Sequence, residues 1–146
     1  HAAGGDALVV SVGYRLAPEH PYPAAVDDTW AVTRWVLRHA AELGGDPGRV
    51  AVAGDSAGGN LAAVMAQLAR DAGTPLRYQL LWYPSTTFDT SLESFAENAG
   101  APVLDAAACR GFTRWYLSGA DVDMSAPPAT LVPARGDLAG TAGVAV

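Results

Sequence analysis

One serine stands in a setting that could make it a nucleophile. Ser56 is the centre of a glycine-rich hexapeptide that fits the pattern G-x-S-x-G and reads Gly54-Asp55-Ser56-Ala57-Gly58-Gly59. A β-branched apolar run ends at Ala53 directly before it, and a helix-forming run follows. In a tight strand-to-helix turn, this pattern strains the backbone of the serine and presents its hydroxyl above the sheet. We therefore predict a positive or otherwise unfavourable φ for Ser56, with Oγ at the carboxyl edge of a sheet.

The neighbours of this serine would support the same chemistry. The N–H of Ala57 would lie at a helix N-terminus and could donate to an oxyanion formed during the reaction. Gly54, Gly58 and Gly59 have no Cβ atom that could clash in the turn. We expect these glycines and Asp55 to support the conformation of the turn. The alternative is an ordinary glycine-rich turn in which the serine hydroxyl caps the helix. The motif alone leaves both interpretations open.

Several cofactor sites do not fit this chain. The glycines of the turn do not match G-x-G-x-x-G, and no acidic residue ends the next strand, which finishes Trp82-Tyr83-Pro84. All 9 basic residues are arginines, which excludes the P-loop lysine, the pyridoxal-phosphate Schiff base and the Ser-x-x-Lys dyad. No Cys/His spacing matches a zinc site. We expect neither a cofactor nor a metal.

Composition narrows the class of partner. The chain has 15 acidic residues against 9 basic ones, a net charge of −6, which argues against nucleic-acid binding. No apolar run approaches the roughly 18 residues that span a bilayer. Cys109, the single cysteine, cannot form an internal disulfide, so we expect a small apolar helix residue in a cytoplasmic protein. Composition leaves the oligomeric state open.

The first half of the chain predicts a parallel β-loop-α-β unit. Ala7–Val12 is a short apolar run expected to form a strand buried on both faces. A Pro-rich loop follows, and an amphipathic helix is expected to begin near Pro23 and to stop at Gly44-Gly45. Arg49–Ala53 is expected to form a second buried strand, joined to the first by a right-handed crossover.

The second half continues this alternation. We expect a helix over Asn60–Ala72, a strand over Tyr78–Tyr83, a helix over about Asp105–Leu117 and a strand beginning at Gly143. Strands alternating with helices are typical of a mostly parallel sheet with helices on its faces. The sequence therefore predicts the α/β class.

Two long motifs carry a family resemblance. Tyr14–Asp28 reads YRLAPEHPYPAAVDD, and Gly54–Ala62 reads GDSAGGNLA. Both resemble the hormone-sensitive-lipase-like esterases, the bacterial branch of the α/β-hydrolases. The family has similar residues at three more places: Tyr83-Pro84, Glu97–Ala99 and Trp115–Leu117. The resemblance covers nearly the whole chain.

This resemblance implies a fold and a function. The fold would be that of an α/β-hydrolase, with an incomplete, mostly parallel sheet flanked by helices. Ser56 would be the catalytic nucleophile, and the Ala57 N–H would be one donor of the oxyanion hole. The reaction would be hydrolysis of a small-molecule ester, with a short or medium acyl group, through an acyl-enzyme.

The residues that would complete a catalytic triad are missing from the sequence. In this fold the triad follows the order serine, then acid, then histidine. All 3 histidines, His1, His20 and His39, precede Ser56. We expect a structural role for His20. The family's His-Gly-Gly-Gly oxyanion motif is also absent, because His1-Ala2-Ala3-Gly4 does not match it.

These absences favour a partial domain. The family's acid follows the strand that begins near Gly143, and Asp137 lies too early to be that acid. We therefore expect residues 1–146 to be part of an α/β-hydrolase domain that is truncated at both ends. In the fold that the chain resembles, another strand lies between Ala7–Val12 and Arg49–Ala53, so the resemblance implies an open slot there, with no direct ladder between them. Two alternatives to a serine carboxylesterase remain: a non-catalytic ligand-binding relative, and an acyltransferase or thioesterase on the same turn.

Overall fold

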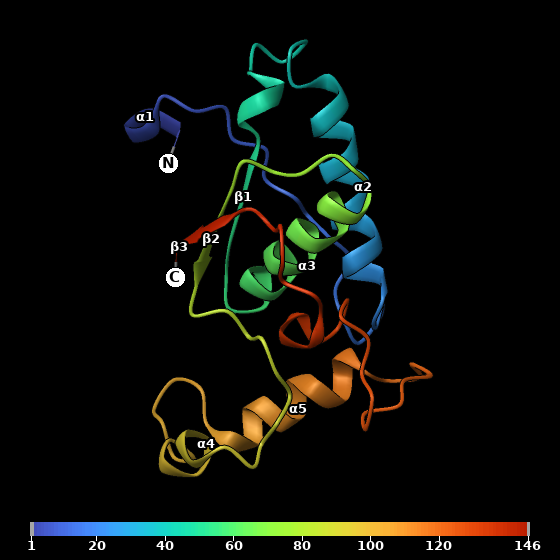
Figure 1. Ribbon diagram of the computed structural model, residues 1–146. Coiled ribbons are helices and arrows are strands. Elements are labelled where there is room, and N and C mark those ends of the chain that lie inside the picture. Colours follow the sequence, from blue (N-terminus) through green and yellow to red (C-terminus); the bar gives the residue numbers. More distant parts are fainter. Residues whose placement is uncertain (1, 146) are drawn as a thin grey trace.

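Three parallel strands form the sheet of this protein. The computed structural model describes residues 2–145, in which β1 (Ala51–Asp55), β2 (Tyr78–Trp82) and β3 (Gly143–Ala145) pair in the order β1-β2-β3 (Figure 1). The register places Asp55 opposite Trp82 and Tyr78 opposite Gly143. The expected parallel sheet is confirmed, with each strand within two residues of its predicted start.

Helices cover the sheet and extend beyond it. The longer ones are α2 (Ala24–His39), α3 (Ala57–Asp71) and α5 (Ala106–Tyr116). The short ones are α1 (Ala2–Gly5), α4 (Glu93–Glu97) and the 3-10 turns η1 (Pro47–Arg49) and η2 (Pro133–Arg135). The helix α3 packs against β1 and β2 on one side and against α2 on the other, while α5 lies beyond the carboxyl ends of the strands (Figure 1).

Local signals explain most helix boundaries. Pro23 holds the N-cap position of α2, and the side chain of Asp105 caps α5 by accepting from the Ala108 N–H at 2.7 Å. Gly73 ends α3 with a φ of 71°, a left-handed conformation that suits glycine. The helix α2 ends at His39, five residues before the predicted stop. The chain continues in turns as far as Gly44, which has a φ of 83°, and the Gly45 N–H donates to the Ala40 carbonyl at 2.8 Å.

The main core lies between α2 and α3. Ala25 and Val26 of α2 pack against buried residues of α3, and Leu76 closes the cluster before β2. The α3 residues are Leu61, Val64, Met65, Ala66 and Ala69. Each large apolar side chain buried here contributes roughly 1.5 to 3 kcal/mol. This packing fixes the N-terminal end of α3, where Ser56 lies.

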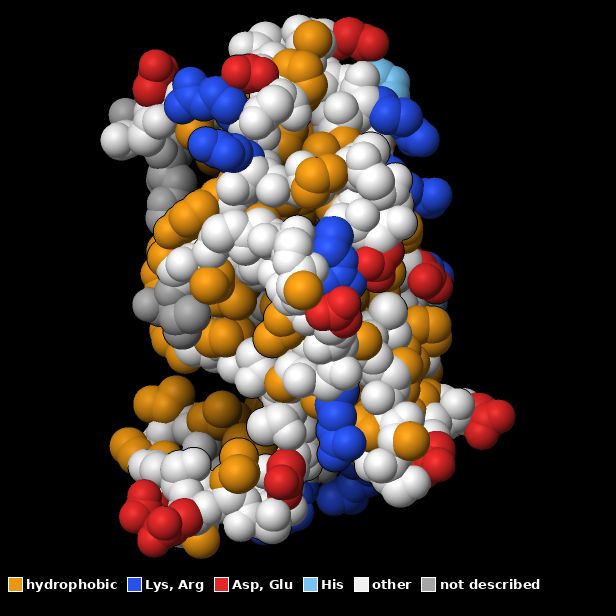
Figure 2. All heavy atoms as spheres, viewed as in Figure 1, with side chains coloured by type: hydrophobic (Ala, Val, Ile, Leu, Met, Phe, Trp, Pro, Cys, Tyr) orange, Lys and Arg blue, Asp and Glu red, His pale blue; other side chains and the backbone are white. Residues whose placement is uncertain are grey.

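Much apolar surface remains exposed. Figure 2 shows hydrophobic side chains over much of this face of the molecule. Acidic and basic side chains are scattered among them. Within residues 2–145, no helix is both long and apolar enough to cross a membrane.

The prediction that Ala7–Val12 forms a strand buried on both faces is wrong. The segment pairs with no strand of the described chain, and Leu8, Val9 and Val10 are 58%, 55% and 41% exposed instead of buried. A strand buries its faces and satisfies its backbone only when neighbouring strands lie beside it. The β-loop-α-β unit predicted from the first half is therefore not formed by the described residues. The strand β1 is likewise an edge of the sheet, and its residues are alternately exposed and half-buried.

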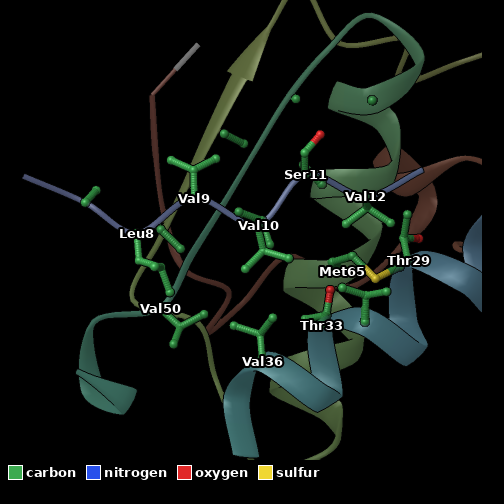
Figure 3. A pocket seen from close by; sticks show the side chains of 18 of the residues that line it. Leu8, Val9, Val10, Ser11, Val12, Thr29, Thr33, Val36, Val50 and Met65 are labelled. Atoms are coloured by element: carbon green, nitrogen blue, oxygen red, sulfur yellow. The ribbon is translucent and has the colours of Figure 1, made fainter. Parts of the chain in front are cut away.

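A cavity of about 1120 Å³ occupies the space between this segment and β1. In Figure 3, Leu8, Val10 and Val12 point toward the side of α2 and Met65, whereas Val9 and Ser11 point away. This alternation is that of an extended strand. The predicted slot and the predicted absence of a direct ladder are thus both confirmed.

Candidate active site

Ser56 lies directly beyond the carboxyl end of β1, in the turn that leads into α3. Its φ is 51° and its ψ is −115°, a conformation that non-glycine residues rarely adopt. Its N–H donates to the Trp82 carbonyl at 2.9 Å, and its carbonyl accepts from Asn60 at 3.0 Å and from Ser85 at 3.1 Å. The predicted strained conformation is confirmed.

The helix-capping alternative is wrong. Ser56 holds the N-cap position of α3, but its side chain makes no capping hydrogen bond, and an N-cap residue ordinarily has an extended backbone with negative φ. Its half-buried side chain instead lines the large cavity. Ala57, the first residue of α3, lines the same cavity, and its N–H donates no hydrogen bond within the described chain. The catalytic roles of both residues stay predictions.

Two of the three glycines are required by close approach. A Cβ on Gly54 would lie 2.2 Å from the Gly58 carbonyl oxygen, and a Cβ on Gly59 would lie 2.9 Å from the Cβ of Pro84. A Cβ on Gly58 would have no described atom within 4 Å, and Gly58 faces the cavity. The exposed Asp55 ends β1 opposite Trp82. The supporting role of Asp55 stays a prediction.

The end of β2 forms the other wall of the turn. Tyr83 has a φ of 35° and is 76% exposed, and Pro84 then passes over Gly59. Sequence reasoning missed this second strained residue, although a Pro directly after an apolar run was a signal for the end of the strand. Residues held in such conformations cluster at functional sites.

Asn60 is a further residue that the sequence did not single out. It is 6% exposed, and its Nδ2 donates to the Ser85 carbonyl at 2.6 Å and to the Leu131 carbonyl at 3.1 Å. The sequence did hold a signal for this residue: Asn60 directly precedes the apolar residues that begin at Leu61. An amide buried among such residues needs hydrogen-bond partners.

The histidines and acids present do not complete a triad. The ring of His39 stacks on Trp35 with centroids 4.7 Å apart, and its Nδ1 contacts the Trp35 carbonyl. Neither His39 nor His20 lines the cavity beside Ser56, and His1 lies outside the described residues. Asp137 precedes β3, as predicted, and accepts from the Ala139 N–H at 2.9 Å. Asp55 lines the cavity with Ser56, but within residues 2–145 the Ser56 hydroxyl forms no hydrogen bond to an acid or a histidine.

An ion pair organises the Pro-rich motif. The Arg15 guanidinium donates to Asp28 through Nη2 at 2.8 Å and Nε at 2.9 Å, and the Arg15 N–H donates to the same carboxylate at 2.9 Å. These hydrogen bonds lower the pKa of Asp28 to about 2. Arg15 is thus the direct partner of Asp28.

The C-terminal helix is tied to this motif. The Tyr22 N–H donates to the Tyr116 carbonyl at 2.7 Å, and the two rings meet edge to face at 5.8 Å. Burial raises the pKa of Tyr116 to about 12. Cys109 is a half-buried free thiol on α5, and the described residues contain no group of three metal-ligating side chains. These contacts are structural and leave Ser56 as the candidate reactive group.

Known proteins share this arrangement. A family model described as the alpha/beta hydrolase fold matches residues 1–146. A protein of Mycobacterium tuberculosis named carboxylesterase NlhH is 63% identical over 142 residues, which are 96% of this chain and 44% of that protein. The chain thus spans less than half the length of this curated relative.

Solved structures agree with the family match. The crystal structure of DphMB1 has a TM-score of 0.92 and 70% identity, covering 98% of this chain and 47% of that one. A hyperthermophilic esterase from Pyrobaculum calidifontis has a TM-score of 0.90 and 42% identity, with the same two coverages of 98% and 47%. Together with the motifs, these matches show that the chain belongs to the α/β-hydrolase fold family, in its hormone-sensitive-lipase-like branch.

Proposed function

We propose that the whole protein is a serine carboxylesterase that hydrolyses short or medium acyl esters. One observation carries the proposal: Ser56 combines a positive φ with a side chain that does not cap the helix, directly before the Ala57 N–H, which has no acceptor within residues 2–145. A nucleophile and an oxyanion donor need this placement. The relatives named carboxylesterase and esterase support the same reaction class.

The reaction proceeds in two steps. The Ser56 Oγ attacks the ester carbonyl carbon while a base takes the hydroxyl proton, and the resulting oxyanion accepts from the Ala57 N–H. The bond to the alcohol then breaks, and the alcohol leaves with the proton. Water attacks the acyl-serine in the second step and releases the carboxylic acid. One oxyanion donor is worth about 10² to 10³ in kcat.

Two groups of this reaction are proposed to lie outside residues 1–146. One is the histidine base, since neither His20 nor His39 lines the cavity with Ser56. The other is the acid that orients it, which the family resemblance places after the strand that begins near Gly143. Residues 1–146 would then form part of one hydrolase domain, in which a further strand fills the slot beside β1. The open backbone edge of β1 and the cavity of about 1120 Å³ support this arrangement.

The test uses the protein expressed from its complete reading frame, called the whole protein below. We expect hydrolysis of p-nitrophenyl butyrate, which Ser56→Ala lowers by several orders of magnitude because no acyl-enzyme forms. A fluorophosphonate should label Ser56, as read by mass spectrometry of the peptide. Ser11→Ala is the matched control, since Ser11 is a second serine at the wall of this cavity and its side chain points away from α2 and Met65 (Figure 3). Activity retained in Ser56→Ala would place the nucleophile elsewhere.

The same assay separates the alternatives. A non-catalytic ligand-binding protein would bind the ester without turnover, and fluorophosphonate would not label it. An acyltransferase would transfer the acyl group to an added alcohol faster than to water, and a thioesterase would prefer a thioester over the matching oxygen ester. Hydrolysis of the oxygen ester as the fastest reaction supports the carboxylesterase.

Two further expectations concern the setting of the enzyme. We propose a cytoplasmic location, for which the unpaired Cys109 is the argument. We also propose that the protein has no nucleic-acid partner, because the chain carries a net charge of −6. Fractionation of the cells and a gel-shift assay at low salt test these two proposals.

A further inference from the structure

Asn60 closes a ring of hydrogen bonds around Ser56. The Asn60 N–H donates to the Ser56 carbonyl at 3.0 Å, and its side-chain Nδ2 donates to the Ser85 carbonyl at 2.6 Å. The Ser85 N–H donates back to the Ser56 carbonyl at 3.1 Å. Each of the three residues is therefore joined to the other two.

The ring acts on the strained part of the turn. The Ser56 carbonyl holds two donors, and one of them depends on Ser85, which lies in an exposed loop after Tyr83. The second hydrogen bond of Nδ2, to the Leu131 carbonyl at 3.1 Å, fixes the amide itself from the opposite side. Without the Asn60 amide, Ser85 would keep only the hydrogen bond from its N–H to the Ser56 carbonyl and would lose the one that its carbonyl accepts.

We propose that Asn60 is a positioning residue for the nucleophile, an inference that rests on the proposed function of Ser56. By holding Ser85 against the turn, Asn60 keeps the Ser56 backbone at positive φ and its Oγ in the direction of attack. Asn60 itself does not touch the substrate. A nucleophile displaced by about 1 Å can lose on the order of 10²-fold in rate, so the effect is measurable.

The same helix offers a matched control. Gln67 is also 6% exposed, and its Nε2 donates to the Pro133 carbonyl at 2.9 Å. It lies seven residues further along α3, away from Ser56. Both side chains thus join α3 to the same following segment through a buried amide, but only Asn60 also holds Ser85.

The experiment compares Asn60→Asp with Gln67→Glu in the whole protein. Each variant keeps the shape of the side chain and replaces its N–H donors with acceptor oxygens. We expect similar losses of thermal stability in both. We expect kcat, and the rate of fluorophosphonate labelling of Ser56, to fall by about tenfold or more in Asn60→Asp alone, with KM changed by less than about threefold.

A second pair of variants keeps the test decisive if Asn60→Asp or Gln67→Glu does not fold. Asn60→Ala and Gln67→Ala remove the same bonds without adding a carboxylate, and the same split between rate and stability is expected. Equal kcat and equal labelling rates in the Asn60 and Gln67 variants, at equal loss of stability, would overturn the inference. A failure of the proposed function looks different, because the unmodified protein would then show neither turnover nor labelling of Ser56.

Discussion

Ser56 and Tyr83 follow paired strands at the same level of the sheet, and both have positive φ. The strands β1 and β2 are in register up to Asp55 and Trp82, and the next residue of each strand turns with a φ of 51° and 35°, respectively. Such conformations cost about 1 to 3 kcal/mol each and persist where the surroundings hold them. Here the surroundings are the hydrogen bond from Ser56 to Trp82 and that from Ser85 to Ser56.

The strain at Tyr83 predicts an unusual order of stabilities. Tyr83→Gly should be more stable than Tyr83→Ala by about 1 kcal/mol, because glycine adopts positive φ without a steric penalty. At Tyr78, the first residue of β2, alanine should be the more stable replacement, since glycine weakens a strand. Urea denaturation of the four variants measures both differences. If the alanine variant were the more stable one at both positions, the backbone of Tyr83 would not be strained.

Close packing at Gly59 predicts a loss of stability on adding one methyl group. The Cβ of Gly59→Ala would lie 2.9 Å and 3.0 Å from Pro84 Cβ and Cα, which a rigid ring cannot avoid. We expect a cost of about 1 to 3 kcal/mol in urea denaturation and a slower turnover. Gly111→Ala, inside α5 with no described atom within 4 Å of the new Cβ, is the control and should gain about 0.5 to 1 kcal/mol.

The Arg15 and Asp28 pair predicts a dependence of stability on pH. The pKa of Asp28 is lowered in the folded state to about 2 from a usual 3.8, so its stabilising contribution is complete above about pH 4. The contribution is lost as the pH falls from 4 to 2. In thermal unfolding, Asp28→Asn should therefore melt below the unmodified protein at pH 6 and approach it at pH 2. Asp27→Asn removes an equal charge without the pair and should not show this convergence.

The open edge of β1 predicts the behaviour of residues 1–146 expressed alone. Unpaired N–H and C=O groups lie beside exposed Leu8 and Val9, and such edges pair with other chains. We expect aggregation in size-exclusion chromatography with light scattering, and no ester turnover above background. A monomeric product with one cooperative melting transition would contradict this expectation.

Local signals made much of the site predictable. The turn around Ser56 and the strand β2 depend on residues adjacent in sequence. The strand β2 was predicted to within one residue, and the helix after Ser56 begins at Ala57, three residues before its predicted start. Ala7–Val12 was misjudged because its burial depends on a neighbouring strand, which local sequence does not reveal. Asn60 and Gln67 were missed because their carbonyl partners lie 71 and 66 residues away, at Leu131 and Pro133. Backbone carbonyls of irregular segments leave no side-chain pattern in a sequence.

One face of α3 directs the path of the chain from Leu131 to β3. Asn60, Gln67 and Arg70 follow at helical spacings, and Arg70 donates to the carbonyls of Asp137 and Ala139. The backbone hydrogen bonds inside this segment are short-range turns, such as those from Arg135 to Val132 and from Gly136 to Pro133, and the α3 side chains join these turns to the helix. The position of β3 beside β2 therefore depends on polar side chains of α3 as well as on the ladder between the two strands.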